Sequence, residues 1–377
     1  MNGLRFADKL MTLRRERKIT QEQLADFLGV TKASVSKWEN KQSLPDILLL
    51  PQLAAFFNVT VDELLGYESQ LSQEQIRKIY QELTEDFAEK PFSEVMEKSR
   101  GYVHRYYSCF PFLIQVGVLW LNHFFMADTQ EEQRNILKEM GDLCEHVRKD
   151  CQNADIRRDA MMLKASADLQ LGKTQEVIET LEDYIQGSSL TMSGEGILVQ
   201  AYQMAGELEK ARSSTQMYMY LRMLDLMQSN ILYLLVNAEN FSVCEETIHR
   251  ADSLIEAYQM KQLNPNAVAQ LEYQAAVTYM MHGKCEQAME RLSQYTAIVL
   301  DMLKQKNFYL HGDAYFDKLD EWIQKLQLGD MPPRNRKLVV ETAVQSLNHP
   351  LFAALETRED FRQLKMQMER LQAGANL

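Results

Sequence analysis

The stretch ITQEQLADFLGVTKASVSKWENK, residues 19–41, decides how the first part of the chain folds. Thr20, with Gln23 in the third position after it, predicts the capped start of one helix, and Gly29 predicts a left-handed residue at its end. Thr31 predicts the cap of a second helix shortly afterwards. The stretch therefore predicts two short helices joined by a tight turn.

The residues around this stretch predict three further short helices. Phe6 and Leu10 lie at helical spacing before it, and Pro45–Asp46 predicts the start of a helix after it. Thr60 predicts the cap of a last helical turn, which Gly66 ends. The first 66 residues are therefore expected to form one five-helix domain.

Charge is distributed unevenly over the 377 residues. The whole chain carries a net charge of −12, yet nine basic side chains accompany only five acidic ones before Gln42. A basic head on an acidic body favours a polyanionic partner for the head. The composition, with 46% apolar and 25% charged residues, is typical of a globular protein.

Membrane, disulfide-rich and enzyme classes are not indicated. The strongest apolar run, Phe110 to Met126, contains Pro111 and several polar residues, and the chain start lacks a signal pattern, so we expect a cytoplasmic protein without a membrane segment. Five cysteines without a CxxC pair predict buried thiols rather than disulfides or a metal site. HExxH, GxSxG and GxxxxGK[ST] motifs are absent from the sequence, so we predict neither catalysis nor a cofactor.

From residue 4 to residue 66 the chain resembles the phage-repressor and Cro-type helix-turn-helix family, also called the xenobiotic-response-element family. The resemblance is carried, in order, by TQEQLA, LGV, a serine-rich helix ending in WENK, a proline and NVTVDELL. In that family the third helix lies in the major groove of DNA. The resemblance therefore implies double-stranded DNA as a partner.

Two sets of residues are predicted to contact the DNA. A helix that starts at Lys32 presents residues 32, 33, 36 and 37 on one exposed face, whereas Val35 and Trp38 point toward the core. This spacing agrees with the base contacts that the family resemblance implies for Lys32, Ala33, Ser36 and Lys37. The resemblance further implies phosphate contacts by Gln21, Thr31, Asn40 and Lys41. A solvated basic helix is the alternative interpretation. Because one such head reads about one half-site, we expect a homodimer and near-palindromic target sites.

Beyond residue 72 nearly all of the sequence predicts helices. Gly172, Gly206 and Asn240 follow one another at intervals of 34 residues, and Gly283 comes 43 residues later. Glycine and asparagine tolerate the left-handed turn that ends a helix, so each residue predicts the corner of a helical hairpin. The period resembles that of tetratricopeptide repeats, over roughly residues 155–305, and implies a curved solenoid.

The predicted fold class is all-α, with a five-helix DNA-binding head followed by an α-solenoid of tetratricopeptide-like helical hairpins. Each repeat buries its apolar face only against its neighbours, so the repeats are expected to stack continuously. The predicted segments are the head (1–66), a linker (67–72), a helical region leading into the solenoid (73–154), the repeats (155–305) and a C-terminal helical cap (306–377).

The inner surface of such a solenoid is expected to present polar side chains to a ligand. The predicted groove residues are Gln200, Gln203, Asn230, Asn237, Gln270 and Tyr273. Carboxamides both donate and accept hydrogen bonds, so a row of them can hold an extended peptide by its backbone. Exposed Asn and Gln are also common on solenoid faces without a ligand. The methionines of the repeats, among them Met219 and Met223, are predicted to fill the core rather than line a ligand pocket.

Head and body together resemble the peptide-pheromone-responsive regulators of Gram-positive bacteria. The resemblance implies a dimeric, sequence-specific DNA-binding transcriptional regulator whose repeat domain senses a peptide or protein ligand. Such a ligand changes DNA affinity only insofar as it binds one dimer geometry better than another. The alternative is a protein-interaction adaptor or an antitoxin-like repressor that is controlled by a protein partner.

Overall fold

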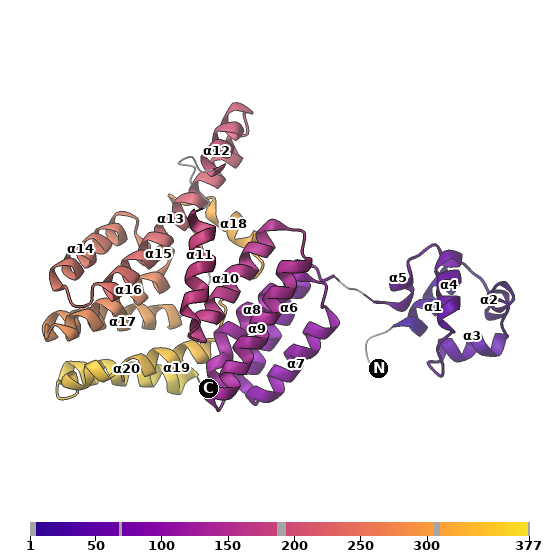
Figure 1. Ribbon diagram of the computed structural model, residues 1–377, viewed down its shortest axis with the longest axis horizontal. Coiled ribbons are helices and arrows are strands. Elements are labelled where there is room, and N and C mark those ends of the chain that lie inside the picture. Colours follow the sequence, from indigo (N-terminus) through magenta and orange to yellow (C-terminus); the bar gives the residue numbers. More distant parts are fainter. Residues whose placement is uncertain (1–4, 68–69, 187–193, 305–309, 376–377) are drawn as a thin grey trace. The chain divides into compact units, whose positions relative to one another are not determined.

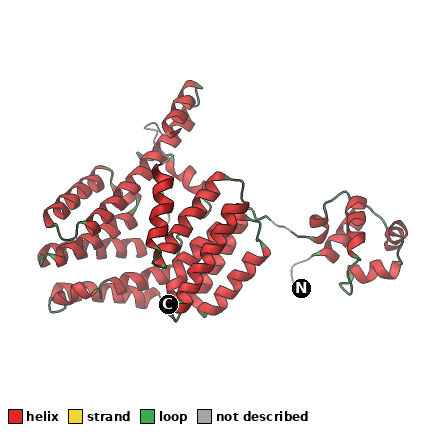
Figure 2. Ribbon diagram, viewed as in Figure 1, coloured by secondary structure: helices red, strands yellow, loops and turns green. Residues whose placement is uncertain are grey.

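The computed structural model describes residues 5–67, 70–186, 194–304 and 310–375. Within these residues every element is a helix, as Figure 2 shows, so the all-α prediction is confirmed. The chain divides into two compact units, residues 1–72 with 102–109 and residues 73–101 with 110–377. The predicted head lies within the first unit. The predicted linker 67–72 and the predicted boundary after residue 305 lie partly outside the described residues, and the other segment boundaries stay predictions.

Local capping signals set the ends of the short helices in the head. Its elements are α1 (Phe6–Glu16), α2 (Gln21–Leu28), α3 (Lys32–Glu39), the 3-10 helix η1 (Ile47–Leu49), α4 (Leu50–Phe57) and α5 (Val61–Leu65). Thr20 and Thr60 each form a capping box, and Gly29 and Gly66 adopt left-handed φ angles of 68° and 64°. The five helices expected from the sequence are therefore confirmed.

One apolar core holds these five helices together. Each α-helix of the head contributes at least one side chain with an exposed fraction of 0%, and these are Leu10, Leu24, Val35, Leu53 and Leu64. Helices this short are marginal in isolation, so the head depends on their mutual packing. Full burial of each such side chain stabilises the domain by about 1.5–3 kcal/mol.

The second unit is built from longer helices that pack on their neighbours along the chain. Its elements are α6 (Gln73–Glu89), α7 (Phe92–Arg105, whose last turn belongs to the first unit), α8 (Phe110–His123), η2 (Phe124–Met126), α9 (Gln130–Asp150), α10 (Ala154–Gln170), α11 (Thr174–Gln186), α12 (Gly194–Met204), α13 (Leu208–Val236), α14 (Phe241–Ala257), α15 (Met260–Leu263), α16 (Pro265–Met281), α17 (Cys285–Lys304), α18 (Leu319–Lys325), α19 (Arg336–Ser346), η3 (Pro350–Leu355) and α20 (Glu359–Ala375). Figure 1 shows α8, α9 and α10 side by side, and α16 beside α17.

Three of the four predicted hairpin corners are left-handed glycines. Gly172, Gly206 and Gly283 have φ angles of 79°, 78° and 65° and separate consecutive helices, as expected. The prediction of a left-handed turn at Asn240 is wrong, because its φ angle is −104°. Asn240 instead caps the start of α14, where its side chain accepts a hydrogen bond from the Val243 N–H at 3.3 Å. Asn240 still lies at the corner between α13 and α14, but it begins the second helix rather than ending the first.

Helix α13 departs from the repeat pattern. A 34-residue period predicts a turn between the second helix of one hairpin and the first helix of the next. Instead, α13 continues for 29 residues, from Leu208 to Val236. No glycine or proline occurs between these two residues, so nothing in the sequence breaks the helix.

The corner between α16 and α17 allows a test of the backbone argument. Gly283 is left-handed and has no neighbouring atom within 4 Å of an added Cβ atom, so Gly283→Ala introduces backbone strain without a clash. We expect this substitution to lower the free energy of unfolding by about 1 kcal/mol. Gly101→Ala, inside α7 and with the same open space, is the matched control and should raise it by about 0.5–1 kcal/mol. Urea unfolding measures both free energies. If both substitutions raised, or both lowered, the free energy of unfolding, the role of the left-handed Gly283 would be contradicted.

Candidate nucleic-acid interface and ligand cavity

Helix α3 has one buried face and one exposed face. Val35 and Trp38 point into the core of the head, as predicted. Lys32, Ala33 and Lys37 are exposed, and Ser36 is half-buried. The four residues predicted to contact bases therefore lie together on α3, opposite its packed face.

The start of α3 is fixed by Thr31, whose hydroxyl accepts a hydrogen bond from the Ser34 N–H at 3.2 Å. At the other end, Asn40 donates to the Ser36 hydroxyl at 3.3 Å, and an oxygen of Asp8 lies 3.0 Å from the Lys41 ammonium group. These three residues of the predicted phosphate set flank the base-facing residues. Each one is exposed.

Gln21, the fourth residue of the predicted phosphate set, begins α2 and is tied to the end of α3. Its side-chain N–H donates to Glu39 Oε2 at 2.7 Å. This bond joins the two helices of the motif. It also occupies one donor of Gln21. In the first turn of α2 the Gln23 N–H donates to the Thr20 hydroxyl at 3.1 Å, so the capping box already uses one N–H of this helix N-terminus.

A buried ion pair beneath α3 was not predicted from the sequence. Arg14 of α1 donates to both carboxylate oxygens of Glu39, at 2.6 and 3.0 Å, and also to the Ile19 carbonyl oxygen at 2.8 Å. The side chains of Arg14 and Glu39 are only 14% and 3% exposed. Burial alone would raise the pKa of Glu39, but the hydrogen bonds from Arg14 and Gln21 outweigh burial and lower it. Glu39 is therefore held as a carboxylate that links α1, α2 and α3.

The exposed lysine at the start of α3 has a weak intramolecular partner. The Lys32 ammonium group lies 3.5 Å from Glu22, and both side chains are more than half exposed. Exposed pairs of this kind contribute about 0–1 kcal/mol, so Lys32 can exchange Glu22 for another anion at little cost.

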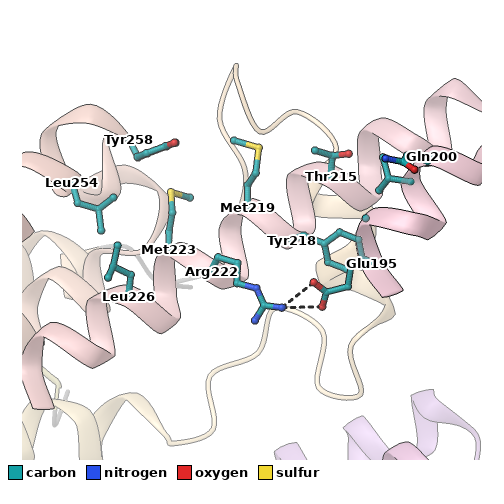
Figure 3. Close-up of a pocket in the computed structure, with 12 residues that line it drawn as sticks. Glu195, Gln200, Thr215, Tyr218, Met219, Arg222, Met223, Leu226, Leu254 and Tyr258 are labelled. Atoms are coloured by element: carbon teal, nitrogen blue, oxygen red, sulfur yellow. Dashed lines mark hydrogen bonds and ion pairs between the residues drawn. The ribbon is translucent and has the colours of Figure 1, made fainter. Parts of the chain in front are cut away.

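The second unit contains a cavity of about 660 Å³ between α12 and α13, which Figure 3 shows. Apolar side chains form most of its wall, among them Val199, Met219 and Leu226. Arg222 lies at its edge and donates to both carboxylate oxygens of Glu195, at 3.1 and 2.8 Å. A volume of this size is typical of small-ligand sites.

A second cavity of about 400 Å³ adjoins the first along the same pair of helices. Val199, Thr215 and Met219 line both cavities. Met219 is half-buried and Met223 is buried against the core. The prediction that these two methionines fill the core rather than line a pocket is therefore only half right, since both also face the first cavity.

The six predicted groove residues are not all brought together. Gln200 lines the first cavity and Gln203 the second. Asn230 is half-buried and Gln270 is exposed, and neither lines either cavity. Asn237 ends α13, where its side chain donates to the Tyr233 carbonyl oxygen at 2.9 Å.

Tyr273, the sixth predicted groove residue, is engaged by the C-terminal helices. Its hydroxyl donates to the Ser346 carbonyl oxygen at 3.3 Å, and its ring packs edge-on against Phe352 at 5.9 Å. The sequence prediction did not anticipate that α19 and η3 cover this position.

None of the helices among the described residues combines the length and apolar character that a bilayer crossing requires. The same residues contain no cluster of three or more His, Cys, Asp or Glu side chains able to hold a metal ion.

Comparison with known proteins places the clearest similarity in the head. A family model described as helix-turn-helix matches residues 10–64. The transcriptional activator BcrR of Enterococcus faecalis is 37% identical over 83 residues, which are 20% of this chain and 41% of BcrR. The regulator YobD of Bacillus subtilis is 33% identical over 86 residues, covering 23% of this chain and 73% of YobD. The phage CTXphi repressor RstR of Vibrio cholerae is 31% identical over 98 residues, covering 25% of this chain and 86% of RstR.

Two solved structures are similar over a greater length but only distantly. The competence regulator ComR of Streptococcus vestibularis, in its apo form, is 13% identical with a TM-score of 0.26, covering 85% of this chain and 97% of ComR. PlcR of Bacillus thuringiensis, in complex with the peptide PapR7 and DNA, is 16% identical with a TM-score of 0.25, covering 79% of this chain and 96% of PlcR.

The buried ion pair predicts an acid-sensitive head. Because the pKa of Glu39 in the folded head lies below the ordinary value of 4.5, the folded state binds fewer protons than the unfolded state near that pH. The stabilisation is therefore complete above about pH 4.5 and is lost as the pH falls through the lower folded value. We expect Glu39→Gln to destabilise the head by about 3 kcal/mol at pH 7 and to reduce this acid dependence.

Hydrogen exchange of the α2 and α3 amides measures this effect separately from the second unit. Glu16→Gln, at an exposed position on α1, is the matched control and should leave the exchange rates nearly unchanged. If the α2 and α3 amides exchange at the same rates in Glu39→Gln and Glu16→Gln, Glu39 does not stabilise the head.

Proposed function

This chain belongs to the helix-turn-helix family of DNA-binding transcriptional regulators, and we propose that it acts as a sequence-specific homodimer whose helical body senses a peptide or protein ligand. The similarity to known regulators lies in the head. This chain covers only 41% of the length of BcrR. The DNA sites, ligands and partners of the whole protein are therefore proposed.

The exposed face of α3 is the observation that best supports the sequence-specific role. Val35 and Trp38 hold one side of the helix in the core, and this leaves Lys32 and Lys37 on the side that a DNA groove can reach. Ala33 is small enough to let the helix backbone lie close to base edges. Lysine ammonium groups can donate to guanine O6 and N7, although as point charges they discriminate less sharply than arginine.

The proposed phosphate contacts surround this face. Lys41 has a left-handed φ angle of 62°, a conformation in which glycine costs less than lysine. Among the described residues, its side chain forms an exposed ion pair with Asp8. The turn that ends α3 holds this conformation, with the Gln42 N–H donating to the Lys37 carbonyl oxygen at 2.9 Å. The exposed charge of Lys41 can meet a phosphate of the bound duplex.

The proposed ligand site is the cavity between α12 and α13. Its size, its apolar wall and the carboxamide of Gln200 suit a peptide segment. In this mechanism the ligand shifts DNA affinity by favouring one arrangement of the dimer.

A protein partner is the second candidate for the ligand. The end of α13 exposes large apolar side chains, with exposed fractions of 51% for Leu232, 52% for Leu235 and 78% for Val236. Neighbouring exposed apolar side chains of this kind often mark protein interfaces. A stoichiometric protein that copurifies with the chain, and that Leu235→Ser releases, would favour an adaptor or antitoxin-like role.

Direct base contacts predict a loss of sequence preference when the lysines are removed. We expect wild-type protein to select near-palindromic duplexes from a random pool, because each head of a dimer reads one half-site. In Lys32→Ala/Lys37→Ala the preference for the selected duplex over random DNA should fall by at least about tenfold, equivalent to about 1.4 kcal/mol. Lys9→Ala, at an exposed position on α1, is the single-charge control. A uniform drop in affinity for all duplexes would instead assign these lysines to phosphates.

The strained lysine predicts opposite effects on folding and binding. Lys41→Gly should raise the free energy of unfolding of the head by about 1 kcal/mol, because it relieves the left-handed strain. It should also weaken duplex binding and reduce the slope of log affinity against log salt by about 0.9. Lys18 is exposed and also left-handed, with a φ angle of 57°, so Lys18→Gly is the matched control for the backbone change. An unchanged salt slope in Lys41→Gly would exclude the phosphate contact.

A further inference from the structure

We propose that the seam between α12 and α13 binds an apolar peptide that ends in a free carboxylate, with Arg222 recognising that carboxylate in place of Glu195. This inference rests on the ligand-sensing role proposed above and specifies its chemistry. Glu195 then acts as an internal competitor, which occupies Arg222 until the ligand arrives.

The two cavities form one elongated site. The residues of α13 that line them recur every three or four positions, from Leu208 at one end to Leu226 at the other. At 1.5 Å per residue this part of the helix is about 27 Å long. An extended chain advances about 3.3 Å per residue, so roughly eight residues would follow the seam. The shape favours a linear ligand over a compact one.

The lining is suited to apolar side chains of varied shape. Val199, Leu226 and Leu254 provide aliphatic surface, and Met219 and Met223 add flexible thioether side chains that adapt to their neighbours. Figure 3 shows Met219, Met223 and Leu226 on α13 and Leu254 on α14, around the same space.

The charge at the edge of the seam points to a single carboxylate. Arg222 makes a two-bond contact with Glu195, and Asp225 lies 3.4 Å from another of its nitrogens. A ligand carboxylate that takes the place of Glu195 on Arg222 adds one negative charge beside Glu195 and Asp225. A phosphate dianion would add two, so this arrangement favours a monoanion.

The contact between Arg222 and Glu195 is easily exchanged. Their side chains are 63% and 37% exposed, and pairs exposed to this extent contribute little to stability. Breaking this contact therefore costs little. Affinity comes from burial of the apolar part of the ligand, whereas Arg222 sets its orientation and its requirement for a free carboxylate.

Polar groups along the seam favour a peptide over a fatty acid. Gln200 lines the first cavity and Gln203 the second, and each carboxamide can both donate and accept a hydrogen bond. A peptide backbone can use such groups along its length. A fatty acid has only its carboxylate to offer, so it would gain no hydrogen bonds from these two exposed carboxamides along its chain.

The test uses the full-length protein and a library of random octapeptides with free C-terminal carboxylates. Peptides enriched by the wild-type chain are resynthesised as acids and as C-terminal amides, and their affinities are measured by calorimetry. We expect apolar sequences whose acids bind at least about tenfold more tightly than their amides. Dodecanoate is included as a fatty-acid probe and should bind more weakly than the selected acids.

Substitutions of Arg222 and Glu195 test whether these two residues cause the difference in affinity between acids and amides. Arg222→Gln should abolish the difference between acid and amide, whereas Glu195→Gln should bind the acids roughly threefold to tenfold more tightly, because the competing carboxylate is gone. Arg250 forms a similar exposed pair with Glu246 on α14, and neither residue lines a cavity, so Arg250→Gln is the matched control. It should behave as the wild type does.

The outcomes separate this inference from the proposed function. Equal binding of acids and amides, wild-type behaviour of Arg222→Gln, stronger binding of dodecanoate, or no enriched peptide would each overturn the inference. Duplex affinity is measured with and without the enriched peptides. If duplex affinity changes although acids and amides bind alike, ligand sensing stands and the role of Arg222 fails. If acids bind as expected and duplex affinity stays constant, the site stands and the regulatory function fails.

Discussion

The head depends on the contact between Arg14 and Glu39. Two short hydrogen bonds at 2.6 and 3.0 Å join α1 to the last turn of α3, and the bond from Gln21 adds the start of α2. A buried carboxylate without these donors would be costly, so all three elements must be in place together. The exposed face of α3 is therefore presented from a fixed support, which is what recognition of base edges requires.

The second unit supports a different kind of chemistry. Its seam between α12 and α13 combines an apolar wall with one exposed ion pair at the edge, and a contact this exposed can be exchanged without loss of the fold. The head uses a buried ion pair for rigidity, whereas the seam uses an exposed one for selectivity. The difference in burial decides which role each pair can serve.

Much of the head could be predicted from sequence because its signals are local. Thr20, Gly29 and Thr60 fix helix ends through bonds within a few residues, and each was found as expected. The Arg14–Glu39 pair spans 25 positions, and no local pattern marks it. In the second unit, Asn240 was assigned to the wrong side of its turn because asparagine suits both a left-handed residue and a helix cap. The contact of Tyr273 with Phe352 of η3 was not predicted, because η3 lies far along the chain and no local pattern marks the contact.

The central claim is that the exposed face of α3 reads bases in the major groove. The most direct measurement is a crystal structure of the full chain with a duplex selected from a random pool. The account predicts α3 in the major groove, with the Lys32 or Lys37 ammonium group within hydrogen-bond distance of guanine O6 or N7 and Lys41 beside a phosphate. A complex in which another element enters the groove, while α3 faces solvent, would contradict it.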